Sequence, residues 1–79
     1  MTILFDIGNT HTHLGLANAE RVVRQMNIPT VAWFSGAAER AVRKFIGRAS
    51  LEGAALCSVV PRATPRVARM VGRIEAASS

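Results

Sequence analysis

The chain has 79 residues, enough for one small domain with a limited hydrophobic core. Its net charge is +5, and 49% of its residues are apolar, which excludes an intrinsically disordered chain. The single cysteine, Cys57, excludes an internal disulfide and the cysteine-based zinc motifs, and indicates a reduced, cytoplasmic protein. No apolar run approaches the ~18 residues that cross a membrane, and the first residues carry Asp6 and no basic cluster, so we expect neither a membrane span nor a secretory signal.

Nearly all of the positive charge comes from arginine, since Lys44 is the only lysine. An arginine excess can form a surface for nucleic acid or phosphate. The arginines are spread from Arg21 to Arg73 without a dense run, and aromatic residues are not interleaved with them. This spacing favours a solvated surface, and a small basic nucleic-acid-binding module stays as an alternative function.

Three strands are predicted in the first part of the chain, at Thr2–Asp6, His11–Ala17 and Arg21–Ile28. The first is a continuous apolar run, and the second alternates between two faces, as strands do. The Gly8-Asn9 turn between them suits a hairpin, because Asn tolerates left-handed backbone. Pro29 is expected to end the third strand.

A helix is predicted from a capping Thr30 to about Arg48, since apolar residues recur there at helical spacing. The predicted apolar face consists of Val31, Phe34, Ala38, Ala41, Val42 and Phe45. The Ser35-Gly36 pair weakens the first turn, so Ser35 is an alternative start.

A buried strand is predicted at Ala54–Val60, which carries no charge and is closed by Pro61. The Thr64-Pro65 pair then predicts the start of a second helix. Its expected apolar face is Val67, Met70, Val71 and Ile74, and its polar side is Arg66, Arg69 and Arg73. The tail Ala76–Ser79 contains no helix stop signal. The element order βββαβα predicts an α/β fold with helices packed on a mixed sheet, in which a helical crossover places the last strand parallel to the first.

The residues with most chemical potential are Asp6, Gly8, Asn9 and Thr10, in the first turn. A carboxylate at a strand end can hold Mg²⁺ together with phosphate oxygens. A glycine lets backbone approach a phosphate closely, and the Asn and Thr side chains can donate hydrogen bonds to it. The same residue types are ordinary turn formers, so a purely structural turn is the stronger reading from the residues alone.

The stretch from Leu4 to Thr10, Leu-Phe-Asp-Ile-Gly-Asn-Thr, resembles the first phosphate motif of type III pantothenate kinases. These enzymes belong to the acetate kinase, sugar kinase, Hsp70 and actin superfamily, with its ribonuclease H-like domains. The segment from Cys57 to Pro65 is similar to the family's Ser-Val-Val-Pro strand end and the Thr-Pro helix start that follows. The resemblance spans about Thr2 to Ile74, with a poorly matched middle.

This resemblance implies ATP-dependent phosphorylation of pantothenate to 4'-phosphopantothenate, the first step of coenzyme A biosynthesis, in the cytoplasm. It places Asp6 near Mg²⁺ and the transferring phosphate, with Gly8, Asn9 and Thr10 lining the ATP phosphate pocket. It also implies a monovalent cation, K⁺ or NH₄⁺, bound beyond this chain, and a homodimer for the full-length enzyme.

The sequence also departs from the family in ways that imply an incomplete enzyme. Residues 1–79 correspond to an incomplete first, ATPase-like domain of a two-domain kinase. The pantothenate-binding Gly-x-Asp-Arg motif and the second phosphate loop are absent, and Asp6 is the only aspartate, so no catalytic base is assigned. We expect the chain alone to be inactive, and to be unstable or self-associating because its last strand becomes a sheet edge. Alternatives are a non-catalytic fragment or regulator of the same fold, and a superfamily member with another acceptor.

Other reactive residues have weaker claims to a function. His11 and His13 share a strand face but have no apparent third ligand, which argues against a metal site. Cys57 lies in an apolar strand and is interpreted as a packed small side chain rather than a nucleophile. Trp33 and Phe34 are interpreted as helix packing rather than base stacking. The glutamates are widely separated and form no carboxylate pair.

Overall fold

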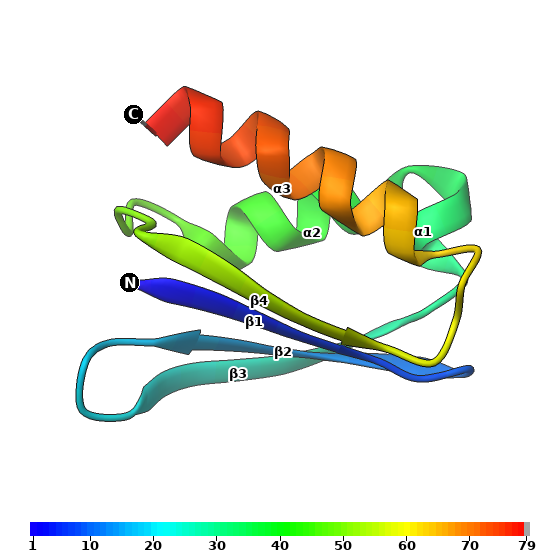
Figure 1. Cartoon of the computed structure of the whole chain (residues 1–79), viewed down its shortest axis with the longest axis horizontal. Coiled ribbons are helices and arrows are strands. Elements are labelled where there is room, and N and C mark those ends of the chain that lie inside the picture. The colour runs from blue at the N-terminus through cyan, green and yellow to red at the C-terminus, as the bar shows by residue number, and fades with distance from the viewer. Residues whose placement is uncertain (79) are drawn as a thin grey trace.

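A computed structural model describes residues 1–78, with side chains described through residue 75. The elements in chain order are β1 (Thr2–Ile7), β2 (His11–Ala17), β3 (Val22–Pro29), α1 (Ala32–Ser35), α2 (Ala37–Ile46), β4 (Gly53–Ser58) and α3 (Thr64–Ser78). The strands form one sheet in the order β3-β2-β1-β4, and the helices cover one of its faces (Figure 1). The predicted α/β class with a mixed sheet is therefore confirmed.

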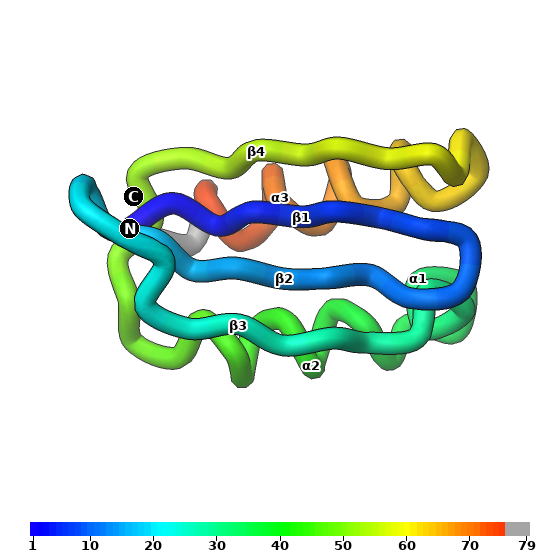
Figure 2. The backbone as a smooth tube through the Cα atoms, turned by 90° about the horizontal axis from the view of Figure 1, so that it is seen from below, coloured from blue at the N-terminus to red at the C-terminus, as the bar shows by residue number. Residues whose placement is uncertain are grey.

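The central strand β1 is antiparallel to β2 and parallel to β4, as the predicted crossover requires. Alternate residues of β1 point to opposite sides of the sheet. Ile3, Phe5 and Ile7 face the helices and are at most 3% exposed. Leu4 and Asp6 lie on the other face, which no described helix covers and which we call the open face (Figure 2).

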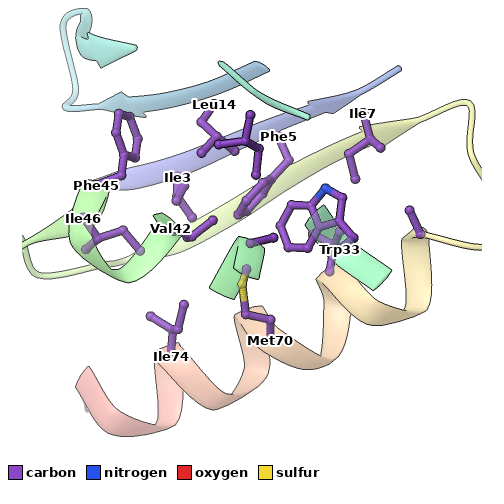
Figure 3. Packing of buried hydrophobic residues seen from close by; sticks show 14 of the residues in the cluster. Ile3, Phe5, Ile7, Leu14, Trp33, Val42, Phe45, Ile46, Met70 and Ile74 are labelled. Atoms are coloured by element: carbon purple, nitrogen blue, oxygen red, sulfur yellow. The ribbon is translucent and has the colours of Figure 1, made fainter. Parts of the chain in front are cut away.

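The hydrophobic core fills the space between the helix-covered face and the helices (Figure 3). Leu14 and Leu16 of β2 meet Val42 of α2 and Met70 of α3 in this layer, all of them at most 1% exposed. Trp33 of α1 packs edge-on against Phe5, with ring centroids 6.0 Å apart. The interpretation of Trp33 as a packing residue is thus confirmed.

Most strand boundaries agree with the predicted ones. β2 is the same, β1 is one residue longer, and β3 runs to Pro29 instead of stopping before it. Pro29 is tolerated because β3 is an edge strand, where a missing N–H removes no bond to a further strand. The helix start at Thr64 is confirmed, and its buried residues Val67, Met70 and Ile74 are those predicted.

The single helix predicted from Thr30 to Arg48 is wrong. The segment is broken into α1 and α2 at Gly36, whose φ of 84° ends one helix and precedes the next. Only glycine adopts this backbone without steric cost. Thr30 caps neither helix, because its hydroxyl hydrogen-bonds elsewhere, and Val31 is 69% exposed rather than part of the apolar face.

The last strand is shorter than predicted and is not buried. β4 ends at Ser58, and Leu56 and Cys57 are exposed, which corrects both the buried-strand prediction and the packed interpretation of Cys57. The physical reason is that β4 is the edge of the sheet and α3 makes little contact with it. The expected self-association through this edge stays a prediction, which sedimentation velocity would test.

Candidate functional site

The turn between β1 and β2 carries three of the four predicted site residues. Gly8, Asn9 and Thr10 form the turn itself, and Asp6 is the last but one residue of β1. Asp6, Asn9 and Thr10 are exposed, so their polar groups are accessible to a ligand. The fold therefore brings all four residues to one end of the sheet.

Gly8 closes the turn through its backbone, and a side chain there would make a tight contact with the chain. Its N–H donates to the carbonyl of His11 at 3.0 Å, and a Cβ at Gly8 would lie 3.1 Å from that same oxygen. Neither Gly8 nor Asn9 has a positive φ, so the left-handed backbone suggested by the Gly-Asn pair is wrong. Glycine is favoured here by the close approach of the chain rather than by its dihedral angles.

A chain of buried hydrogen bonds supports the turn from below. The indole N–H of Trp33 donates to Thr12 Oγ1 at 3.0 Å, and Thr12 Oγ1 lies 3.0 Å from Thr30 Oγ1. The Thr30 hydroxyl donates to the carbonyl of Gly8 at 2.7 Å. The Gly8 carbonyl only accepts, so the single proton of the Thr30 hydroxyl is used in that bond. Thr12 therefore donates its own proton to Thr30, and every donor in the chain points toward the turn. Such a chain is mutually polarised and stiffens the turn.

Thr30, the residue after β3, makes a second hydrogen bond to the turn. The backbone N–H of Thr30 donates to the carbonyl of Thr10 at 2.9 Å, so Thr30 binds both ends of the turn. Sequence reasoning missed the roles of Thr12, Thr30 and Trp33. One signal was available: Thr12 is the polar member of the otherwise apolar face Thr12, Leu14, Leu16, and a hydroxyl on a buried face needs a partner.

The carboxylate of Asp6 lies on the open face beside a shallow cavity of about 240 Å³. His13 is directly opposite it on β2, and both residues line this cavity together with Gln25. Asp6 forms no ion pair within the part of the chain that the structure describes. Its oxygens are therefore available to a cation at the mouth of the turn.

His13 is held between two amide oxygens of β3. Its Nδ1 lies 2.6 Å from Asn27 Oδ1, and its Nε2 lies 2.8 Å from Gln25 Oε1. Amide oxygens only accept, so this arrangement favours the protonated ring, in which both nitrogens can donate. These bonds, that from Asn27 first, raise the pKa of His13 above its ordinary value of 6.5, with a smaller contribution from the charge of Asp6.

The end of β4 reaches the same edge of the sheet. The N–H of Val59 donates to the carbonyl of Ile7 at 3.0 Å, and Cys57 is the parallel partner of Asp6. The two motifs recognised in the sequence, fifty residues apart, therefore meet at the carboxyl ends of two adjacent parallel strands. This is where open α/β sheets bind their ligands.

The side chains at this end of the sheet suit a magnesium ion whose ligands include phosphate oxygens, rather than a metal that is bound by protein side chains alone. Within residues 1–78 the structure gathers no group of three His, Cys, Asp or Glu side chains. Mg²⁺ is commonly bound by one or two carboxylates, with phosphate oxygens and water completing its shell. A single accessible carboxylate beside a turn with free donors matches that chemistry.

Comparisons with known proteins identify the family of the chain. None of the described helices is long and apolar enough to span a membrane. Comparing the chain with curated proteins gave no match. The family model for type III pantothenate kinase matches residues 2–78, nearly the whole chain and both motifs at the sheet edge. The chain therefore belongs to the type III pantothenate kinase family.

Proposed function

We propose that this chain provides the ATP phosphate-binding hairpin for the phosphorylation of pantothenate to 4'-phosphopantothenate. The observation that carries the proposal is the turn Gly8–Thr10, which is clamped by Thr30 at the carboxyl ends of β1 and β4, with Asp6 exposed beside it. Family membership supports the kinase activity and the choice of pantothenate as acceptor.

Each site residue has a defined task in this proposal. Asp6 would hold Mg²⁺, which neutralises charge on the phosphates when it is bound. The side chains of Asn9 and Thr10 donate to phosphate oxygens, and Gly8 lets the backbone approach them. Because Thr30 fixes the turn, these donors need little reorganisation when charge develops on the phosphoryl group. A monovalent cation, K⁺ or NH₄⁺, is expected to bind outside these residues.

We further propose that the catalytic base and the pantothenate pocket lie outside residues 1–79, in the remainder of a two-domain, cytoplasmic and dimeric enzyme. Asp6 is the only aspartate in the chain, and among the described residues no glutamate lines the cavity beside it. A carboxylate that holds the metal is poorly suited to accept the proton of the acceptor hydroxyl as well. The chain alone is therefore expected to bind nucleotide without turning it over.

Calorimetric titration of ATP into the chain tests the role of Asp6. With Mg²⁺, Asp6→Asn is expected to weaken binding about tenfold or more, since it removes a charged ligand of the ion. With EDTA, the same variant should bind ATP no more weakly than the original chain, because the carboxylate then only repels phosphate. Glu20→Gln, which removes a charge at the other end of β2, is the matched control. It should change neither the ATP affinity with Mg²⁺ nor the ATP affinity with EDTA. Equal Mg·ATP affinity in Asp6→Asn would contradict the proposal.

A turnover assay tests the placement of the base. The chain is incubated with ATP, Mg²⁺, K⁺ and pantothenate beside an Asp6→Ala variant, and 4'-phosphopantothenate is quantified. We expect no product from either. Product formation that Asp6→Ala abolishes would show that the chain assembles a complete site by itself. It would contradict the proposal that the base lies outside residues 1–79.

A further inference from the structure

A second candidate site lies in the helix layer, on the opposite side of the sheet from Asp6. Arg66, Arg69 and Arg73 follow one another at intervals of three and four residues, which aligns them along one side of α3, and Arg62 lies in the turn that precedes this helix. The three arginines of α3 line a cavity of about 300 Å³, whose other wall includes Gly36 and Glu39. We call this cavity, lined by Arg66, Arg69 and Arg73, the arginine groove.

Phe34 holds two of these side chains in place. The guanidinium carbons of Arg62 and Arg66 each lie 5.2 Å from the centroid of the Phe34 ring. An arginine stacked on a ring has a fixed plane, and its N–H edge remains free to bind a planar or tetrahedral anion by two hydrogen bonds. Two like charges sharing one ring also repel each other, and a bound anion would relieve that repulsion.

The charge of the groove is compensated at one end only. Glu39 accepts hydrogen bonds from Arg73 and from Arg43, and these bonds, that from Arg73 first, lower the pKa of its carboxyl group. Within the described residues, Arg66 and Arg69 form no ion pair with a carboxylate. The uncompensated end of the groove is therefore a concave site lined by the guanidinium groups of Arg66 and Arg69, with no carboxylate paired to either among the described residues.

We propose that the arginine groove binds a small phosphate-bearing anion at the end that is lined by Arg66 and Arg69. Guanidinium groups in a fixed fork match the oxygens of a phosphate group. A cavity of this size is at the lower end of the range for small-molecule sites. A nucleic-acid strand fits less well, because its continuous line of phosphates would pass the Glu39 carboxylate where the groove ends. This site is independent of the proposed kinase function.

Sodium tripolyphosphate is the probe, used in EDTA so that no metal-dependent binding at the hairpin contributes. The chain is labelled with ¹⁵N, and the Nε–H signals of its arginines are followed through the titration. We expect saturable shifts of the Arg66 and Arg69 signals and of the Gly36 amide. The double variant Arg66→Gln/Arg69→Gln should weaken binding about fivefold or more. The control Arg40→Gln/Arg48→Gln loses the same charge on exposed residues elsewhere and should bind as the original chain does.

Three results would overturn the proposal. Equal weakening in both double variants would show that only net charge matters. Shifts confined to the amides of the β1–β2 turn would place the anion at the hairpin instead. A single-stranded RNA oligonucleotide that shifts the same arginines and binds more tightly than tripolyphosphate, with a steep dependence on salt, would identify a nucleic-acid surface. Circular dichroism of each variant verifies that it is folded.

Discussion

The two faces of the sheet are made by the same strands and have opposite roles. On the helix-covered face, Phe5 and Leu14 are buried in a continuous core. On the open face, their sequence neighbours Asp6 and His13 are exposed and polar. Because strand residues alternate between faces, every second residue of a strand packs in the core, and the residues between them are available for chemistry on the open face. Open-face residues such as Asp6 and His13 can therefore be replaced with little effect on the core.

The largest expected effect comes from truncating a helix-covered residue. Leu14 is fully buried, so Leu14→Ala should lower the free energy of unfolding by about 2–5 kcal/mol, through lost burial and a residual cavity. Leu4→Ala makes the same chemical change at a half-buried open-face position and should cost about 1 kcal/mol. Urea denaturation followed by circular dichroism measures both. Equal losses would contradict the division between the two faces.

The hydrogen-bond chain under the turn gives an intermediate effect. Thr12→Val keeps the shape of the side chain but leaves the indole N–H of Trp33 without its acceptor, at a cost of about 1–3 kcal/mol in unfolding free energy. The turn also loses its support, so Mg·ATP affinity should fall. Thr2→Val, at a half-buried position on the open face, is the matched control. If both variants unfold at the same urea concentration, the chain of hydrogen bonds does not brace the turn.

The smallest effect concerns protonation on the open face. The fold raises the pKa of His13, so protonation of this ring stabilises the folded state. That stabilisation is fully present below pH 6.5, the pKa of the ring in the unfolded chain, and is lost as the pH rises through the higher pKa of the ring in the folded chain. Proton NMR titration of the His13 ring should give a pKa above 6.5. Asn27→Ala removes the larger cause and should lower that pKa. A value that stays unchanged in Asn27→Ala would show that the amide oxygens do not stabilise the charged ring.

Local patterns were sufficient to predict most of the fold. The strands β1 and β2 were predicted because apolar runs and alternation are local signals, and the start of α3 because Thr64-Pro65 is one. The weak point at Ser35-Gly36 was predicted, but the separate helix α1 before it was not, since helical periodicity continues across Gly36 and only the backbone angle separates the two helices. The exposure of β4 depends on its position at the sheet edge, which local periodicity does not show.

The candidate site was predictable in part for the same reason. Its four proposed residues fall within five consecutive positions, from Asp6 to Thr10, so a motif identifies them together. Among the residues that hold them, Thr12 lies 18 residues before Thr30 and 21 before Trp33, and only the folded chain brings it to them. Positioning contacts of this kind carry little sequence signal beyond a polar side chain on a buried face.

The most direct test of the proposed phosphate site is an NMR map of nucleotide binding. A non-hydrolysable ATP analogue with Mg²⁺ is added to the ¹⁵N-labelled chain, and the backbone amide shifts are measured. We expect the largest shifts at Asp6 and at residues 8–10, and smaller ones at Thr30, which clamps the turn. Shifts confined to the helix layer, with the turn unaffected, would show that the hairpin is structural only and would contradict the proposed function.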